Sequence, residues 1–271
     1  MNREIKAIYI IWLREIIRYW RNKTRAISGL AMPVLWIVVM GSGLSSSLRF
    51  TPNGSTGGFD YINFIFPGII AMTLLFSSVF SALSLVYDRE FGFFKEIFVA
   101  PISRTSIVLG KVLGGATTAT IQASLMFFLA PIVGITLTPK SILLLLPAMF
   151  LVAFGMSSLG ILIASRMKST ETFPMVMQFI MMPMFFLSGA LFPLREAPGW
   201  LSIIAKFNPL TYGVNLLRGI IFSAEGISSE VLQSLNFTIL GQTLTYSLNL
   251  FIFLGFALVT IFLSVLAFKR I

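Results

Sequence analysis

The chain has 271 residues, of which 56% are hydrophobic and 11% charged, whereas a soluble domain carries about 25% charged residues. This composition excludes a water-soluble globular protein, and the absence of histidine and cysteine removes the usual proton shuttle, general base and metal ligands. The net charge of +10 could indicate nucleic-acid binding, but the basic residues flank apolar runs, so we expect membrane lipids as partners and no nucleic acid.

Residues 1–25 alternate basic and apolar side chains with a helical period. This pattern predicts an amphipathic helix on the inner face of the membrane and lacks the continuous apolar core of a signal peptide. A basic flank that only sets topology is the alternative. The apolar positions of this helix are Ile5, Ile8, Tyr9, Trp12, Ile16 and Tyr19.

Six apolar runs follow, each close to the roughly 20 residues that cross a bilayer as a helix. The predicted spans are approximately 26–48, 61–87, 106–134, 141–165, 171–193 and 244–268. The third is free of Asp, Glu, Lys and Arg only from Val112 onward, and the fifth from Thr172. The fold class is therefore an all-α integral membrane protein with six transmembrane helices.

The Lys and Arg residues are distributed unequally between the two sides of these spans. If both termini lie inside, the inner segments hold 15 of the 20 basic residues and the outer segments hold 5. The positive-inside rule then predicts that both termini are cytoplasmic.

The inner loop over 88–100 mixes charges with aromatic side chains and ends at Pro101. A short helix from about Glu90 to Val99 could press its aromatic side chains into a soluble partner. Burial of the same side chains in the bilayer interface is the alternative that the residues leave open.

The outer segment 194–218 is punctuated by proline and glycine, and its two apolar pieces, around 200–204 and 216–217, are too short to span. It predicts short re-entrant or surface helices at the outer end of the fifth span.

The apolar runs lack the ionisable residues that couple transport to an ion gradient. Gly110-Lys111 lacks the earlier glycine of a phosphate-binding loop, so nucleotide hydrolysis is not expected on this chain. The amides of Asn63, Gln122, Gln178 and Asn249 are expected to serve helix packing. The small residues Gly110-x-x-x-Gly114 and Gly160-x-x-x-Ala164 predict close helix approach.

Flexible methionines and phenylalanines concentrate in the second and fifth spans, where they could form an adaptable apolar path for a substrate. A lipid-facing or packing stripe is the alternative. The candidate path residues are Phe76, Phe80, Phe173, Met177, Met181 and Met184.

Three segments resemble the ABC-2 type permease subunits, within them the daunorubicin-resistance-like drug exporters. They are Asp88-Arg-Glu-Phe-Gly with Ala100-Pro-Ile-Ser103, Phe186-Leu-Ser-Gly-Ala-Leu-Phe-Pro193, and Asn208-Pro-Leu-Thr-Tyr212. The resemblance covers nearly the whole chain and implies the ABC-2 (type V exporter) architecture, with an interface helix at 1–25 and a transmembrane domain at 26–271.

The resemblance also implies roles for particular residues. It implies that 88–100 is a coupling helix docking on an ATPase through Asp88, Arg89, Glu90, Phe91, Gly92, Phe94, Lys95 and Glu96. It implies that the interface helix acts near the ATPase through Arg14, Arg18, Trp20 and Arg21. It implies that spans one, two and five line the path, and that the outer re-entrant segment includes Pro193, Trp200, Asn208, Pro209 and Tyr212.

The resulting expectation is the permease subunit of an ATP-driven exporter in a bacterial cytoplasmic (inner) membrane. Two copies of the chain would join two copies of a separate ATPase subunit, which would hold ATP and Mg²⁺, so that this chain binds no cofactor and is not itself an enzyme. The substrate would be a lipophilic or amphipathic drug, antibiotic or lipid. A polysaccharide or lipid-linked glycan, or a scaffold or sensor that transports nothing, are the alternatives.

Overall fold

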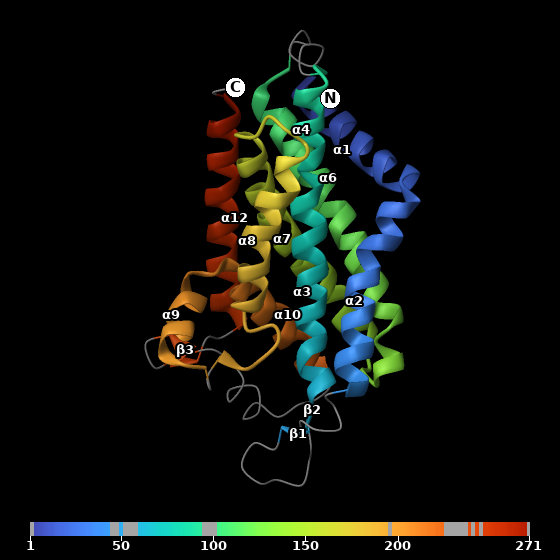
Figure 1. Cartoon of the computed structure of the whole chain (residues 1–271), viewed down its shortest axis with the longest axis vertical. Coiled ribbons are helices and arrows are strands. Elements are labelled where there is room, and N and C mark those ends of the chain that lie inside the picture. Colours follow the sequence, from blue (N-terminus) through green and yellow to red (C-terminus); the bar gives the residue numbers. More distant parts are fainter. Residues whose placement is uncertain are drawn as a thin grey trace.

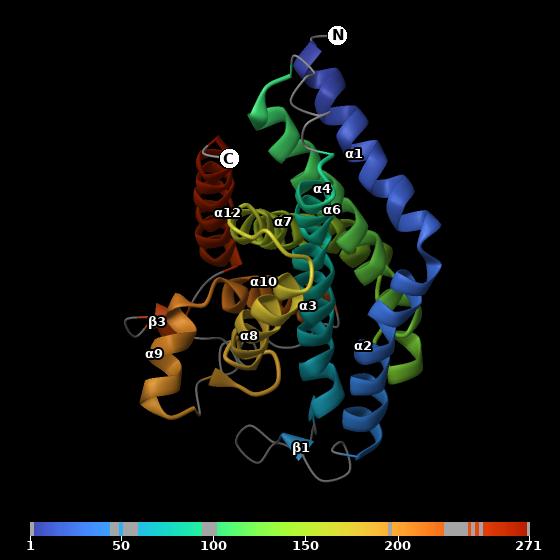
Figure 2. The same cartoon turned by 45° about the horizontal axis from the view of Figure 1, so that its top comes forward.

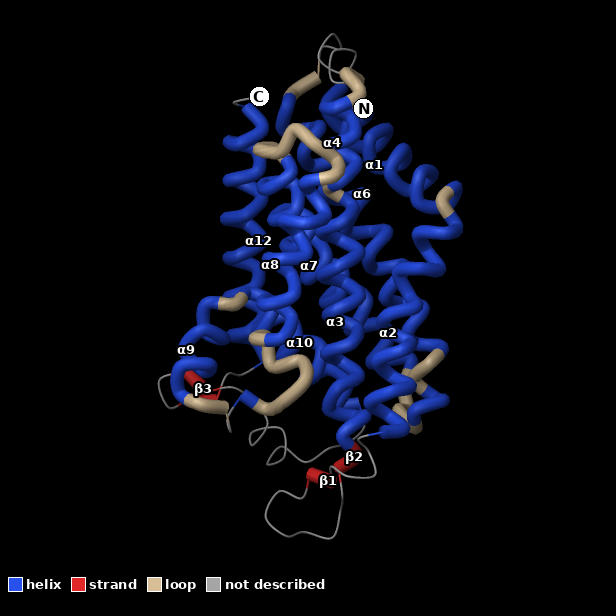
Figure 3. Tube along the Cα trace, viewed as in Figure 1, coloured by secondary structure: helices blue, strands red, loops and turns tan. Residues whose placement is uncertain are grey.

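The computed structural model describes residues 3–43, 49–50, 59–93, 102–194, 197–224, 238–239, 242–243 and 246–269. These residues form a helical bundle with two pairs of two-residue antiparallel strands. The two ends of the chain lie at the same end of the bundle (Figure 1), and the strands lie at the opposite end (Figure 3). This arrangement agrees with the expectation that both termini face one side of the membrane.

The helices are α1 (Arg3–Arg21), α2 (Lys23–Gly43), α3 (Tyr61–Ser81), α4 (Leu83–Glu90), α6 (Arg104–Ser124), α7 (Pro139–Ala164), α8 (Thr172–Phe186), α9 (Gly199–Phe207), α10 (Pro209–Ala224) and α12 (Tyr246–Lys269). Two 3₁₀ helices follow α6, η2 (Leu125–Phe128) and η3 (Pro131–Val133). The strands are β1 (Arg49–Phe50), β2 (Phe59–Asp60), β3 (Thr238–Ile239) and β4 (Gln242–Thr243).

Helix α3 is the centre of the bundle. It packs against α2, α6, α7, α8 and α10, and Figures 1 and 2 show it between α2 on one side and α7 and α8 on the other. Most of its side chains are buried, including Phe64, Phe66 and Leu74. A helix this apolar all round is suited to full enclosure by other helices.

Three helices in the described part of the chain are both long and apolar enough to cross a bilayer, at Tyr61–Glu90, Pro139–Ala164 and Tyr246–Lys269. Two shorter apolar helices cover Ile27–Met40 and Thr172–Phe186. The structure therefore supports a multi-pass membrane protein, while the count of six spans stays a prediction.

Two predicted spans are shorter as helices than the apolar runs that predicted them. The helix expected over 106–134 ends at Ser124 and continues as 3₁₀ turns around Pro131, whose ring cannot continue a regular helix. The helix expected over 171–193 ends at Phe186, because Gly189 adopts a φ of +72° and the chain turns back. Fifteen helical residues span only about 22 Å.

The N-terminal helix packs against α6 through the two glycines that predicted close approach. A Cβ atom on Gly110 would lie 2.8 Å from the Cβ of Ile11, and one on Gly114 would lie 2.6 Å from that of Glu15. The Nε1 of Trp12 donates to Thr117 Oγ1 at 3.0 Å. On the outer face of α1 the apolar side chains Ile5, Tyr9, Ile10, Ile17 and Trp20 are exposed, which is the surface expected of a helix in contact with lipid.

Gly160 confirms the second small-residue prediction. A Cβ atom there would lie 3.0 Å from the carbonyl oxygen of Val79, so α7 approaches the backbone of α3 closely at this point. The close approach has no room for a side chain, which is why a glycine is required.

Candidate functional site

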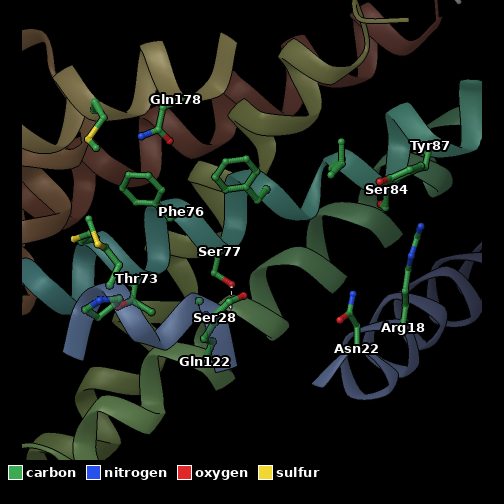
Figure 4. A pocket seen from close by; sticks show the side chains of 17 residues that line it. Arg18, Asn22, Ser28, Thr73, Phe76, Ser77, Ser84, Tyr87, Gln122 and Gln178 are labelled. Atoms are coloured by element: carbon green, nitrogen blue, oxygen red, sulfur yellow. Dashed lines mark hydrogen bonds between the residues drawn. The ribbon is translucent and has the colours of Figure 1, made fainter. Parts of the chain in front are cut away.

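A pocket of about 560 Å³ lies between α1, α2, α3, α4, α6 and α8 (Figure 4). Its apolar wall includes Phe76 and Phe80, whose ring centroids are 6.5 Å apart in a stacked arrangement. Met32 and Met72 complete that wall from α2 and α3. Stacked rings and flexible thioethers can adapt to apolar groups of different shapes.

The pocket includes two of the predicted path residues and excludes the other four. Phe76 and Phe80 line it, but α8 contributes Gln178 and Met182. Phe173, Met177 and Met181 point the other way and are fully buried in the core, and Met184 lies outside the lining. The pocket is therefore lined by another face of α8 than the one that carries Phe173, Met177 and Met181, and the role of these residues in the path stays a prediction.

Amide and hydroxyl groups line the middle of the pocket. Ser77 donates to Gln122 Oε1 at 2.9 Å, across the contact between α3 and α6. The Gln122 amide also lies against Gly29, where an added Cβ would meet its Nε2 at 2.0 Å. Gln122 and Gln178 thus place hydrogen-bonding groups beside the apolar wall of the cavity, a role beyond the helix packing that was expected of them.

The end of the pocket nearest the chain termini is polar. Arg18 and Asn22 from the α1–α2 corner face Ser84 and Tyr87 of α4 (Figure 4). The Arg18 guanidinium carbon lies 5.6 Å from the centroid of the Tyr87 ring, a cation–π distance. The pocket is therefore amphipathic, with aromatic rings at one end and a cation at the other.

A cluster of four charged side chains lies directly behind this polar end, and three of them, Lys111, Asp88 and Glu15, are buried, whereas Arg14 is 43% exposed. Lys111 Nζ lies 2.7 Å from Asp88 Oδ2 and 3.2 Å from Glu15 Oε1, and it donates to Ser84 Oγ at 3.1 Å. Arg14 contacts the same Asp88 oxygen at 2.6 Å. The two cations and two carboxylates balance, which makes their burial tolerable.

Glu15 shows how strongly the cluster is coupled. Burial opposes ionisation of its carboxyl group, but Lys111 and Arg14 outweigh burial and hold the pKa of Glu15 below its usual range. The carboxylate therefore stays charged and joins α1 to α6.

This cluster lies where the helices extend beyond the apolar runs that lack ionisable residues. Lys111 lies inside α6, seven residues after the helix begins, and Asp88 lies in α4, which prolongs α3. Both side chains are buried. No local sequence pattern links two charges 23 positions apart, so their pairing emerges only from the packing of the helices.

The first three predicted coupling residues are bound to other parts of the bundle. Asp88 is bound within the cluster. Arg89 donates to the carbonyl oxygens of Ser165 and Met167 at 3.0 and 3.2 Å, and Glu90 accepts from the backbone N–H of Thr170 at 2.8 Å, so both hold the connection after α7. These three residues end α4. Most of the helix expected from about Glu90 to Val99 lies outside the described residues and stays a prediction.

The remaining coupling residues begin with an exposed turn. Phe91 is 65% exposed, and Gly92 has a φ of +78° that ends the helix. Phe94, Lys95 and Glu96 lie outside the described residues. The turn therefore presents aromatic surface at the same end of the bundle as the chain termini.

The interface-helix residues lie around the cluster and the pocket. Arg14 is ion-paired with Asp88, Arg18 lines the pocket, and Trp20 and Arg21 are exposed on the corner before α2. Arg14 and Arg18 thus contact the end of α4 directly, through Asp88 and Tyr87.

At the opposite end of the bundle, side chains from α3 and α10 hold the turn that follows α8. Asn208 Nδ2 donates to the carbonyl oxygen of Met184 at 2.6 Å, Arg218 donates to that of Gly189 at 2.8 Å, and the Tyr61 hydroxyl donates to that of Leu191 at 2.9 Å. The first bond satisfies a carbonyl group in the last turn of α8, and the other two hold the segment that follows the helix.

The predicted outer residues all belong to this region. Asn208 also caps α10 by accepting from the N–H of Leu210 at 3.0 Å, and Tyr212 donates to the carbonyl oxygen of Lys206 at 2.7 Å. Pro193 is buried, Pro209 begins α10, and Trp200 is 62% exposed on α9. The two short pieces expected outside are therefore the helices α9 and α10, and α10 is largely buried.

The model of the family described as ABC-2 type transporter matches residues 6–222, which include α1, the pocket, the charged cluster and α10. The chain belongs to the ABC-2 type transporter family. It is 31% identical over 258 residues to a transport permease, ycf38, of Cyanophora paradoxa, covering 94% of this chain and 88% of that one.

Two further relatives match a smaller part of this chain. A transport permease ycf38 of Porphyra purpurea is 31% identical over 219 residues, covering 79% of this chain and 73% of that one. Nodulation protein J of Rhizobium meliloti is 26% identical over 217 residues, covering 79% of this chain and 80% of that one. ABC-2 permeases are membrane components that are generally non-catalytic and normally work with an ABC ATPase subunit. The chain is therefore a multi-pass membrane permease.

Proposed function

We propose that this ABC-2 permease exports an amphipathic small molecule, such as a drug, an antibiotic or a lipid, through the pocket between α2, α3 and α8. The amphipathic lining carries the proposal: the stacked rings of Phe76 and Phe80 would contact the apolar part of the substrate, and Gln122, Gln178 and Arg18 its polar part. Within the ABC-2 permeases, this lining favours the drug-exporter branch.

A separate ATPase, in two copies and carrying ATP and Mg²⁺, would supply the energy to a homodimer of this chain in a bacterial inner membrane with both termini cytoplasmic. The ATPase would dock on the turn that begins at Phe91 and on the loop after it. Motion there would reach the pocket through Asp88, Lys111 and Ser84, which form a continuous chain of polar contacts. The pocket would then alternate between inward and outward access.

Purification of the tagged protein in mild detergent, followed by mass spectrometry, tests the partner. We expect an ATPase with a phosphate-binding loop at one copy per permease. If conditions that preserve a known ABC complex yield no such partner, the chain is a scaffold or sensor and the export proposal is wrong.

Export of a polysaccharide or lipid-linked glycan is the second candidate function. The two amides beside aromatic rings favour it, because sugars combine hydroxyl groups with apolar faces that such a lining can bind. Stimulation of the ATPase by lipophilic drugs, compared with lipid-linked sugars, distinguishes the two substrate classes.

A further inference from the structure

A second hollow, of about 650 Å³, lies between α1, the start of α2 and the end of α4. We call it the basic groove, because its lining includes Arg14, Arg18, Arg21 and Lys23 against a single carboxylate, Asp88. The groove adjoins the pocket, and both share Arg18 and Asn22.

The charges of the basic groove do not balance. Asp88 is already bound by Lys111 at 2.7 Å and by Arg14 at 2.6 Å. Among the described residues, Arg18, Arg21 and Lys23 form no ion pair with a carboxylate, and all three side chains are exposed to the groove. Within the described part of the chain, cations therefore outnumber carboxylates around the groove, as in a site for an anion.

The positive potential of the groove comes from its side chains. Helix α1 ends at Arg21 and α2 begins at Lys23, so the negative end of one helix dipole lies beside the positive end of the other and the two offset each other.

The connection with the pocket indicates what the anion is attached to. Arg18 and Asn22 lie at one end of the pocket, while Phe76 and Gln178 lie farther along it (Figure 4). A phosphate group in the basic groove could thus continue as an apolar chain past Arg18 to the stacked rings. Phe93 and Ile17, which are 51% and 48% exposed, give the groove an apolar rim that suits a lipid better than an acidic protein surface.

We propose that the basic groove binds the phosphate group of an anionic lipid-like molecule while its apolar chain occupies the Phe76–Phe80 pocket. This inference rests on the proposed export function and defines its substrate as a phosphate-bearing amphiphile that enters from the inner leaflet. Clusters of basic residues next to a membrane surface attract anionic headgroups through charge.

Native mass spectrometry of the full-length protein in detergent tests the proposal by resolving bound lipids during titration. Phosphatidylglycerol, which is anionic, is compared with net-neutral phosphatidylcholine of the same acyl chains. We expect the wild type to prefer phosphatidylglycerol, and the triple variant Arg18→Gln/Arg21→Gln/Lys23→Gln to bind it at least about tenfold more weakly. The matched control Arg3→Gln/Lys6→Gln/Lys168→Gln removes three exposed cations elsewhere and should change binding less than about twofold.

Two further measurements test whether the basic groove and the Phe76–Phe80 pocket bind one lipid together. Phe76→Ala/Phe80→Ala should also weaken phosphatidylglycerol binding, because the chain loses its contacts. Inorganic phosphate at the same concentration should not displace the lipid. Equal binding by the wild type, both triple variants and the pocket variant would overturn the proposal, as would displacement by inorganic phosphate alone. Loss of the ATPase partner with unchanged lipid binding would reassign the groove to protein docking.

The failure of this inference differs from the failure of the proposed function. ATP-driven transport of a neutral amphiphile, with no preference for anionic lipid, would overturn the inference and leave the export function standing. Anionic lipid binding as expected, with no ATP-driven movement of any amphiphile, would overturn the function and leave the binding site standing.

Discussion

Lys111 Nζ lies 2.7 Å from Asp88 Oδ2, in a buried ion pair that joins the middle of α6 to the end of α4. The same ammonium group donates to Ser84, which lines the pocket, while Asp88 also binds Arg14 of α1. Three helices thus meet at one pair of residues, next to the segment expected to dock on the ATPase. A shift of α1 or α4 must rearrange this pair, because neither charge can be left buried alone.

Substitution of Lys111 by Met should destabilise the protein by about 3–5 kcal/mol, because Asp88 and Glu15 would then share only Arg14. Chemical unfolding of the purified protein in detergent measures the loss. The double variant Lys111→Met/Asp88→Asn restores the charge balance and should be more stable than the single variant. A single variant as stable as the wild type would show that the cluster carries no such coupling.

Substitutions of Gly115 and Gly255 by alanine are expected to change the stability of the protein in opposite directions. A Cβ atom there would lie 2.1 Å from Ser81 Oγ and 2.5 Å from Ser157 Oγ, where α3, α6 and α7 meet. Gly115→Ala should therefore cost about 1–3 kcal/mol through overpacking. Gly255→Ala in α12 has nothing within 4 Å and should gain about 0.5–1 kcal/mol from helix propensity. Thermal unfolding of both variants compares the signs, and stabilisation by Gly115→Ala would contradict the packing at this junction.

Asn208 is expected to stabilise both ends of the outer turn. Asn208→Ala removes the donor to Met184 and the cap of α10, and should cost about 1–3 kcal/mol. The neighbouring Phe207 is 85% exposed, so Phe207→Ala should change stability by less than about 0.5 kcal/mol. Chemical unfolding separates the two variants, and equal stability would mean that the turn is held by other contacts.

The sequence predicts the large features of this fold because they depend on local patterns. The apolar runs predicted the long helices, the mixed basic and apolar period predicted α1, and the spacing of Gly110 and Gly114 predicted a close contact. The contacts that could not be predicted join helices that are distant in sequence. Nothing near Lys111 indicates that it meets Asp88, since a lysine at the edge of an apolar run also fits a cytoplasmic flank.

The candidate pocket was predictable only in part for a similar reason. Phe76 and Phe80 lie on the face of α3 that the pocket exposes. In α8, methionines occur on several faces, so their spacing could not distinguish Met177 from Met182. Gln178 was the available signal, because a polar side chain in an apolar helix tends to face a cavity or another polar group.

Glu4 predicts a pH dependence at the start of α1. Its carboxylate accepts hydrogen bonds from the Ser103 and Ser106 hydroxyl groups and the Ser103 N–H, and these bonds lower the pKa of Glu4 below 4.5. Because the folded-state pKa lies below the unfolded one, this stabilisation is present above pH 4.5 and is lost as pH falls through the folded pKa.

Hydrogen exchange of the first turns of α1 measures this effect. Protection in the wild type should be unchanged between pH 7 and 5 and should fall below pH 4.5, after correction for the intrinsic exchange rate. Glu4→Gln should show reduced protection at neutral pH and a smaller decrease in acid. Equal profiles for the two proteins would contradict a docking role of Glu4.

ATP-dependent transport by the permease, reconstituted with its ATPase in proteoliposomes, tests the role of the pocket most directly. Phe76→Ala/Phe80→Ala removes the stacked rings and should lower transport of a lipophilic substrate at least about tenfold. Phe179 lies in the same bundle, but it is 82% exposed and outside the pocket lining. The control variant Phe179→Ala should therefore transport like the wild type. A double variant that folds, binds the ATPase and transports at the wild-type rate would contradict the assignment of this pocket as the substrate path.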